Sequence, residues 1–555
     1  MKDFKKSTIY QIYPKSFYDT NGDGIGDLNG VIEKLDYLKN LGIDYIWLTP
    51  FYPSPQVDNG YDISDYYNID PRFGTLEDFE NLVQEAEKRD IYVMLDMVLN
   101  HTSTEHEWFK KAINGDRKYK DFYVFKESEK DKPPTNWESK FGGNAWEYVE
   151  KFDEYYLHLF DRTQADLNWD NEEVRNEIYD VVNFWLKKGV KGLRFDVINL
   201  ISKPEKFESD TEGDGRRFYT DGPKIHDYLH ELNENTYGKY EDIITVGEMS
   251  STSLENCIRY SNPEEKELSM VFNFHHLKVD YYKGDKWTVM DFDFMKLKAL
   301  FKTWQEEIQN GWNALFWCNH DQPRIVSRFG NDKEYLKESA KMLATTIHMM
   351  RGTPYVYQGE EIGMTNPYFD SIEKYRDVES INYYNILKEQ GKSEEEILQI
   401  LKVKSRDNSR TPVQWDDSEN AGFTKGEPWI PVSSEYKRIN VEQALKDEDS
   451  IFYYYQKLIK LRKDYEVISN GNIKFILEED NKVLSYVRTL GDITILVINN
   501  FYGESTKVEL PDEYADKSAK SKILISNYKD SSILSKELSL RPFESIVYHI
   551  ENQEL

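Results

Sequence analysis

Short apolar segments alternate with helical patterns along most of the chain, and this alternation limits the fold more than any other feature. The segments lie at 9–13, 45–48, 91–97, 192–197, 243–246, 270–274, 314–317 and 355–357. Each is bounded by polar residues, glycine or proline, as expected of strands buried in a parallel sheet. Amphipathic helices are predicted between them, for example after Thr75, which resembles an N-cap with Asp78 three residues later. Eight strand-and-helix units favour an α/β fold of the closed (β/α)8 TIM-barrel type over an open sheet.

Two long stretches interrupt this alternation. The stretch 101–170 follows the third strand and is rich in Trp, Tyr, Gly and Asn. A structureless loop of that length is uncommon in a compact domain, so we predict an inserted domain there. A second insertion is expected at about 366–426, after the eighth strand. From 472 to 555, short alternating segments such as 483–487 and 493–498 predict a C-terminal antiparallel β-domain, which leaves 1–100 and 171–471 for the barrel.

The chain is strongly acidic. Its 555 residues include 71 Lys and Arg against 100 Asp and Glu, a formal net charge of −29. Such a chain should repel nucleic acid and anionic membranes. Its two cysteines, Cys257 and Cys318, form no disulfide framework, and we find no secretory leader and no apolar run of membrane-spanning length. We therefore expect a cytoplasmic monomer or weak oligomer whose partner is a small molecule.

Charged side chains follow four of the predicted strands. They are Asp96 and His101 after the third strand, Arg194 and Asp196 in the fourth, Glu248 after the fifth, and His320 and Asp321 after the seventh. A barrel gathers the carboxyl ends of its strands at one mouth, so these groups are expected to meet there.

Carboxyl groups that meet in a cleft suit the cleavage of a glycosidic bond. A retaining glycosidase needs one carboxylate and one carboxylic acid, about 5 Å apart. Arg194 lies two residues before Asp196, on the same strand face, so its guanidinium should keep Asp196 ionised. Glu248 follows an apolar strand, which suits an acid whose pKa is raised by burial.

The segments 96–101, 192–199, 247–248 and 319–321 resemble the four signature regions of the α-amylase superfamily, glycoside hydrolase family 13. The resemblance covers essentially the whole chain. It implies that Asp196 is the nucleophile, Glu248 the general acid/base and Asp321 a third carboxylate that stabilises the transition state. It also implies a set of sugar-binding residues, namely Tyr61, Asp62, His101, Arg194, His320 and Arg410. Asp62 and Arg410 would close the pocket over the 4-hydroxyl, which restricts cleavage to the ends of short substrates.

The segment 19–27, Asp-Thr-Asn-Gly-Asp-Gly-Ile-Gly-Asp, alternates oxygen ligands with glycine and resembles the first half of an EF-hand loop. Gly30 stands where an EF-hand needs its bidentate Glu, so the motif is incomplete. Related α-glucosidases carry a structural Ca2+ or Mg2+ in this loop. That resemblance implies a ligand set of Asp19, Asn21, Asp23, the Ile25 carbonyl and Asp27. No cofactor is expected for the chemistry itself.

Within the superfamily, segments 213–223, 247–252 and 272–281 resemble the phospho-α-(1,1)-glucosidases. The related oligo-1,6-glucosidases usually have Pro where Ser250 stands and an acidic residue where His275 stands. After the sixth strand lies a basic loop, from which we take His275, His276, Lys278 and Lys286 as candidate phosphate ligands. The resemblance implies hydrolysis of trehalose 6-phosphate to glucose and glucose 6-phosphate.

Three other readings stay open. The same chemistry could serve unphosphorylated isomalto-oligosaccharides, as in an oligo-1,6-glucosidase. A non-catalytic barrel, like the heavy chains of amino-acid transporters, would need a membrane helix and would lack the carboxylate set. A calcium buffer is a third class, and one incomplete loop in 555 residues argues against it.

Overall fold

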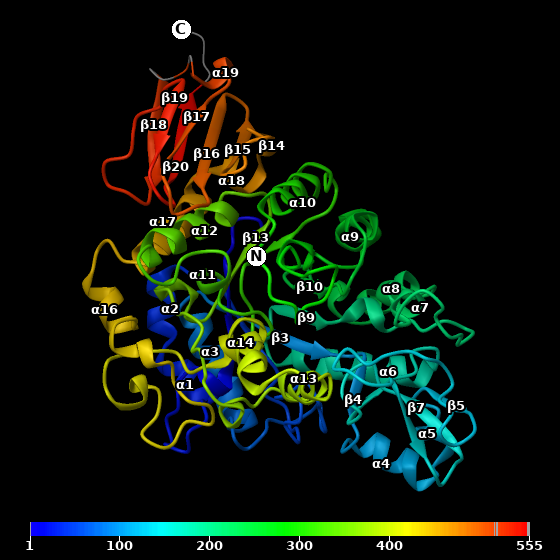
Figure 1. Ribbon diagram of the computed structural model, residues 1–555. Helices are drawn as coiled ribbons and strands as arrows, with labels where there is room; N and C mark the ends of the chain where they lie inside the picture. The colour runs from blue at the N-terminus through cyan, green and yellow to red at the C-terminus, as the bar shows by residue number, and fades with distance from the viewer. Residues whose placement is uncertain (1, 516, 518–519, 552–555) are drawn as a thin grey trace.

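The structure is a computed structural model that describes residues 2–515, 517 and 520–551 (Figure 1). At its centre, the described residues form an eight-stranded parallel sheet in the order β11-β10-β9-β3-β2-β1-β13-β12. The strands are β1 Ile9–Ile12, β2 Tyr45–Leu48, β3 Tyr92–Val98, β9 Gly192–Asp196, β10 Ile244–Glu248, β11 Met270–Phe272, β12 Ala314–Leu315 and β13 Thr353–Tyr357. A parallel bridge between Val271 and Asn313 joins the two edges of the sheet. The sheet is therefore closed, and the predicted (β/α)8 barrel is confirmed.

The outer helices follow the apolar stripes of the sequence. They include α1 Leu28–Glu33, α2 Leu35–Leu41, α3 Leu76–Lys88, α6 Glu172–Lys187, α8 Ile225–Asn235, α9 Leu254–Ser261, α10 Phe294–Glu306, α12 Leu336–His348 and α17 Ile451–Asp464. Helix α3 begins with a capping box, in which Thr75 and Asp78 each bind the other's backbone N–H. Its buried stripe of Phe79, Leu82 and Ala86 repeats at helical spacing and faces the barrel core.

After β3 the chain leaves the barrel and returns at α6. This segment holds β4 His101–Ser103, α4 Glu107–Asn114, α5 Arg117–Lys120, β5 Phe125–Glu127, β6 Trp146–Val149, β7 Glu154–Leu157 and β8 Gln164–Asp166. β4 pairs with β8, and β5, β7 and β6 form a small antiparallel sheet. In Figure 1 these cyan elements lie on one side of the barrel, away from the red C-terminal sheet.

A second excursion follows β13. It contains α13 Val378–Glu389, α14 Glu394–Lys404 and α15 Asp407–Arg410, and Figure 1 shows α13 and α14 on the same side of the barrel as the segment that holds β4. Shorter helices complete this part of the fold, namely α7 Arg216–Tyr219, α11 Ile325–Arg328, α16 Val441–Lys446, α18 Glu466–Asn470 and η5 His275–Leu277.

The C-terminal part is an antiparallel sheet in the order β14-β15-β16-β20-β18, beside the pair β17 and β19. The strands are β14 Asn472–Ile476, β15 Val483–Leu490, β16 Ile493–Asn500, β17 Thr506–Glu509, β18 Ser521–Ser526, β19 Glu537–Leu540 and β20 Ser545–Glu551, with α19 Asp512–Ala515 between β17 and β18. Figure 1 shows this sheet next to α12 and α17. In the described part of the chain, no helix combines the length and the apolar character needed to cross a membrane.

Candidate active site

A cavity of about 250 Å³ opens where the carboxyl ends of the barrel strands meet the two excursions. Its lining includes the three carboxylates expected at the barrel mouth, Asp196, Glu248 and Asp321. Tyr61 and His101 line the same cavity. The strand ends therefore bring together side chains that lie far apart in the sequence, as barrel topology requires.

One guanidinium group holds the first two carboxylates. Nη1 of Arg194 donates to Oδ1 of Asp196 at 2.6 Å, and Nη2 donates to Oε2 of Glu248 at 2.5 Å. Nη1 also donates to Oδ1 of Asp96 at 2.6 Å, so three carboxyl groups share one positive charge. Because both carboxyl groups bind the same guanidinium, Asp196 and Glu248 lie close enough for each to shift the pKa of the other.

The electrostatics favour one proton on this pair. Burial raises the pKa of Glu248 to about 8, although Arg194 opposes the shift. Burial also raises the pKa of Asp196, to about 7, again against Arg194. The pair therefore retains a proton near neutral pH, and the higher of the two pKa values is that of Glu248. Arg194 lowers the pKa of Asp196, as expected, but its positive charge also acts on Asp96 and Glu248.

Asp321 has a different environment. Burial acts to raise the pKa of Asp321, but His320, Arg406 and Arg410 together hold it well below its ordinary value. Its Oδ1 accepts from Nη2 of Arg410 at 2.8 Å and from Nη1 of Arg406 at 3.3 Å. Asp321 is therefore ionised throughout the neutral range.

Aromatic and imidazole rings complete the floor of the cavity. Tyr61 stacks on His320 with ring centroids 5.0 Å apart and an interplanar angle of 4°. The hydroxyl of Tyr61 donates to Oδ2 of Asp96 at 2.9 Å, which fixes the ring. Nε2 of His101 lies 3.2 Å from the carbonyl oxygen of Tyr61. Burial lowers the pKa of His101 to about 4 and that of His320 to about 3, so both rings are neutral.

The prediction that Asp62 closes the pocket over the 4-hydroxyl is wrong. Asp62 is fully buried away from the cavity, where it accepts hydrogen bonds from Ser54 Oγ and from the backbone N–H groups of Val57 and Asp58. It shapes the loop instead of facing a ligand. In this loop, the carboxylate that lines the cavity is that of Asp58, four residues before Asp62.

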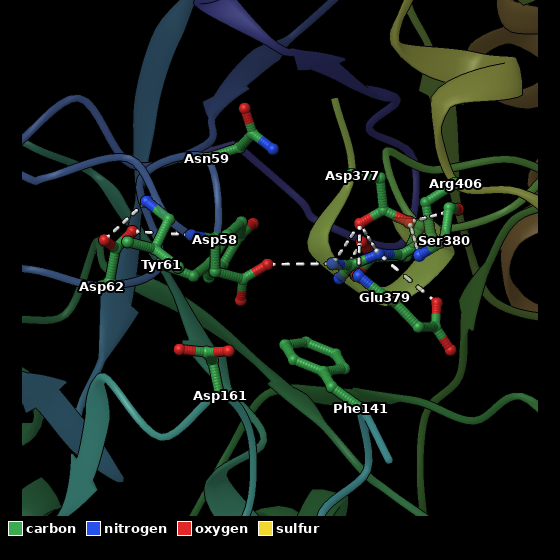
Figure 2. A network of polar contacts seen from close by, with 12 residues as sticks. Asp58, Asn59, Tyr61, Asp62, Phe141, Asp161, Asp377, Glu379, Ser380 and Arg406 are labelled. Atoms are coloured by element: carbon green, nitrogen blue, oxygen red, sulfur yellow. Dashed lines mark hydrogen bonds and ion pairs between the residues drawn. The ribbon is translucent and has the colours of Figure 1, made fainter. Parts of the chain in front are cut away.

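Asp58 is joined to the second excursion by a buried ion pair. Its Oδ1 accepts from Nη2 of Arg406 at 2.9 Å. Figure 2 shows Asp58 and Arg406 pointing toward each other, with Arg406 also bonded to Asp377 and close to Glu379. The guanidinium lies over the ring of Phe141, 4.7 Å from its centroid. Arg406 therefore lines the cavity where Arg410 was expected, while Arg410 is fully buried behind Asp321.

The four basic residues predicted as phosphate ligands separate into two groups. Lys278 and Lys286 line the cavity, but His275 and His276 do not. Nε2 of His276 lies 2.8 Å from the carbonyl oxygen of Phe316, and the ring of His275 packs on Trp304. The two histidines are turned into the barrel wall, so their prediction as phosphate ligands is wrong.

The lysines differ in their partners. Nζ of Lys286 is paired with Oε2 of Glu379 at 2.6 Å. Within the described residues, Nζ of Lys278 has neither a hydrogen bond nor an ion pair, although burial lowers its pKa to about 8. A third lysine of the cavity, Lys140, binds Oγ of Ser250 at 3.2 Å, and burial lowers its pKa to about 8 as well. Both lysines are half-buried at the cavity, and among the described residues neither ammonium group has a carboxylate partner, so both remain available to an anionic ligand.

The segment 19–27 forms a tight loop with several inward-facing oxygen atoms. Asp19 accepts from the backbone N–H groups of Asn21, Gly22 and Gly24, and Asp23 accepts from Ile25. Gly24 has φ +89°, and a Cβ there would meet the carbonyl oxygen of Glu427 at 1.7 Å. The turn therefore needs glycine. Among the described residues, none of the three aspartates of this loop forms an ion pair with Lys, Arg or His, which leaves their charge available to a cation.

The sequence analysis missed several residues of the cavity, among them Asp58, Arg406 and Lys140. Asp58 immediately precedes the Asn-Gly-Tyr-Asp segment and could have been found there. Arg406 begins the Arg-Asp-Asn-Ser-Arg segment from which Arg410 was chosen. Lys140 lies between β5 and β6 and carries no local signal, because only tertiary packing brings it to the barrel mouth.

The chain matches known proteins over nearly its full length. Residues 11–471 match the family model described as alpha amylase, catalytic domain, and residues 483–547 match the alpha-amylase SusG C-terminal domain. The chain therefore belongs to the α-amylase family of glycoside hydrolases. It is 58% identical to the trehalose-6-phosphate hydrolase of Bacillus subtilis (strain 168), covering 99% of this chain and 98% of that one.

The chain is also similar to an oligo-1,6-glucosidase and to a trehalose-6-phosphate hydrolase of known structure. The chain is 51% identical to the oligo-1,6-glucosidase of Bacillus cereus, covering 99% of each chain. A crystal structure of a mutant trehalose-6-phosphate hydrolase from Bacillus licheniformis aligns with a TM-score of 0.96 and 60% identity, covering 99% of each chain.

Proposed function

We propose that this chain is a retaining α-glucosidase that hydrolyses trehalose 6-phosphate to glucose and glucose 6-phosphate. Relatives of that name match it over 98% or more of both chains. The observation that carries the choice of substrate is the pair Lys140 and Lys278, two half-buried ammonium groups that line the same cavity as Asp196, Glu248 and Asp321 and have no carboxylate partner among the described residues. A dianionic phosphate would supply the missing counter-charge.

The first half of the reaction uses two of the three carboxyl groups that bind Arg194, namely those of Asp196 and Glu248. The carboxylate of Asp196 attacks C1 of the unphosphorylated glucose, and the glycosidic bond breaks. Glu248, which retains the proton of the pair, donates it to the departing oxygen. Glucose 6-phosphate leaves, and the glucosyl group stays covalently bound to Asp196.

In the second half, Glu248 acts as a base. It takes a proton from water while the water oxygen attacks C1, and the bond to Asp196 breaks. Glucose is released, and Glu248 is protonated again. Asp321, held ionised by Arg410 and Arg406, is proposed to bind sugar hydroxyls and to stabilise the positive charge that develops on the ring.

The two ends of the cavity are proposed to select the substrate. The ion pair of Asp58 with Arg406 closes the space around the cleaved glucose beside Asp321, and so limits the length of the substrate. Lys278 and Lys140 would hold the phosphate. Lys286 is a weaker candidate, because Glu379 already neutralises it.

The test is a product assay. Incubation with trehalose 6-phosphate should release glucose and glucose 6-phosphate in equal amounts, with a higher kcat/KM than isomaltose at the same pH. Faster turnover of isomaltose than of trehalose 6-phosphate would overturn the proposal in favour of an oligo-1,6-glucosidase, the activity of the Bacillus cereus relative.

We also propose that the segment 19–27 binds a structural divalent cation. The ligands would be Asp19, Asn21, Asp23, the Ile25 carbonyl and Asp27, all of them oxygen donors that suit Ca2+ or Mg2+. Chelation should lower the midpoint of thermal unfolding, and added Ca2+ should restore it. An unchanged midpoint after chelation, checked by metal analysis, would contradict the site.

The domain boundaries remain a prediction. We propose 101–170 as the inserted domain and 472–555 as the C-terminal domain. A cytoplasmic location fits a phosphorylated sugar, because such a substrate does not cross a lipid bilayer unaided. A monomer or weak oligomer remains the expected assembly.

A further inference from the structure

We propose a transition-metal site formed by His226, His230, Glu265 and Glu267, on the outer wall of the barrel. His226 and His230 lie one turn apart on α8, and the two glutamates lie between α9 and β11. These residues are outside the cavity, and neither the reaction nor the segment 19–27 uses them. The inference is independent of the proposed function.

The distances between ligand atoms fit a metal. One ligand atom each from His230, Glu265 and Glu267 lie within 4.8 Å of one another. Oε1 of Glu267 is 3.5 Å from Nε2 of His230 and 2.9 Å from Nδ1 of His226. A tetrahedral zinc site with bonds of 2.0–2.2 Å places its ligand atoms about 3.3–3.6 Å apart. His230, Glu265 and Glu267 therefore need only small side-chain movements to bind Zn2+, and His226, which lies beside Glu267, would be the fourth ligand.

The present partners leave the cluster incomplete. The side chain of Glu267 is fully buried, and its nearest guanidinium nitrogen, Nε of Arg259, is 3.9 Å away. That distance is too long for a hydrogen bond. Nε2 of His230 is shielded from solvent and has no hydrogen-bond partner among the described residues. A cation between His230 and Glu267 would satisfy both groups.

The ligand chemistry selects the metal. Two imidazole nitrogens with two carboxylate oxygens suit Zn2+, Co2+ or Ni2+ better than Ca2+ or Mg2+, which prefer oxygen alone. His226 now bonds both oxygens of Glu267 through Nδ1. On binding, the metal would take the place of the proton on that nitrogen. Glu267 precedes β11, whereas the cavity lies at the carboxyl ends of the strands, so the role is structural.

The test uses the full chain without an affinity tag, stripped of metal and kept in excess Mg2+ and Ca2+ to saturate oxygen-only sites. Titration with Co2+ should give the visible absorption of a tetrahedral complex at one equivalent, and Zn2+ should abolish it. His230→Gln and Glu265→Gln should each weaken binding more than about 10-fold, since even indirect changes at metal sites cost that much. Hydrolytic activity should be unchanged, because both residues lie outside the cavity.

Two further variants sharpen the result. Glu264→Gln, an exposed neighbour outside the cluster, should bind as tightly as the parent chain. Arg259→Gln should bind more tightly, because it removes a positive charge beside the site. Absence of saturable Co2+ and Zn2+ binding, or equal affinity in His230→Gln and the parent chain, would overturn the proposal.

Discussion

At the scale of the residue, an ammonium group that lines a cavity and has no acidic partner is available to bind an anionic ligand. Among the described residues, Lys278 is such a group. Lys278→Met keeps most of the unbranched side chain and removes its charge, so KM for trehalose 6-phosphate should rise about 10- to 150-fold, the equivalent of one hydrogen bond to a charged group. The measurement compares initial rates on this substrate and on a neutral aryl α-glucoside, whose KM should not change.

A matched control lies on the same loop. Lys283 is exposed and does not line the cavity, so Lys283→Met should leave both substrates unaffected. An equal loss on both substrates in Lys278→Met would instead indicate a damaged site and would remove the phosphate assignment.

Glu248 sets the alkaline limb of the activity. Its folded pKa is raised by burial to about 8, so the reactive, protonated form is present below that value and is lost as the pH rises through it. Glu248→Gln should lower kcat on trehalose 6-phosphate by about 10²–10⁴-fold. With an aryl glucoside, whose leaving group needs little protonation, the variant should retain the rate of the first half-reaction, measured as a burst of released aryl alcohol, and this rate should lose the alkaline limb. Persistence of that limb would assign it to another group.

At the scale of the element, the loop that bears Asp58 and the segment that bears Arg406 meet across the cavity. Asp58→Ala should open this contact and leave Arg406 short of one buried partner. We expect kcat/KM for trehalose 6-phosphate to fall about 30-fold or more, since losing one partner of a buried pair costs roughly 2–5 kcal/mol.

In Asp58→Ala, the ratio of kcat/KM for isomaltotriose to kcat/KM for isomaltose should be higher than in the parent chain. Asp62→Asn is the informative comparison, because Asp62 supports the loop from behind. Its main effect should be on thermal stability. An unchanged ratio of the two oligosaccharides in Asp58→Ala would show that the ion pair does not limit substrate length.

The elements also show what the sequence can and cannot predict. The barrel strands were located correctly, because strands buried on both sides are continuous apolar runs. Asp196, Glu248 and Asp321 were predicted to meet at the barrel mouth, and they line one cavity because the ends of the strands fix their place. Asp58 and Asp62 lie in one loop and look alike in sequence, and only the path of the backbone decides which of them faces the cavity. Lys140 depends on how a separate segment packs, which no local pattern records.

At the scale of the whole molecule, a buried arginine joins the C-terminal sheet to the barrel. Arg488 of β15 donates to the carbonyl oxygens of Met349, Ile468 and Gly471 at 2.6–2.7 Å. Arg488→Met would leave these carbonyls unpaired, so the free energy of unfolding should fall by at least about 3 kcal/mol. Urea unfolding measures the loss, and Lys474→Met, an exposed change on β14, is the control. Equal stability of the two variants would contradict this role.

The guanidinium of Arg194 serves Asp96, Asp196 and Glu248 at once, although Asp96 does not line the cavity. The proton affinities of these groups are therefore a collective property. Neutralising Asp96 would leave more of the positive charge to the other two groups and would make both of them more acidic. An attempt to move the working pH of this enzyme would thus begin at a position that never touches the sugar, and it would shift the two limbs of the profile together.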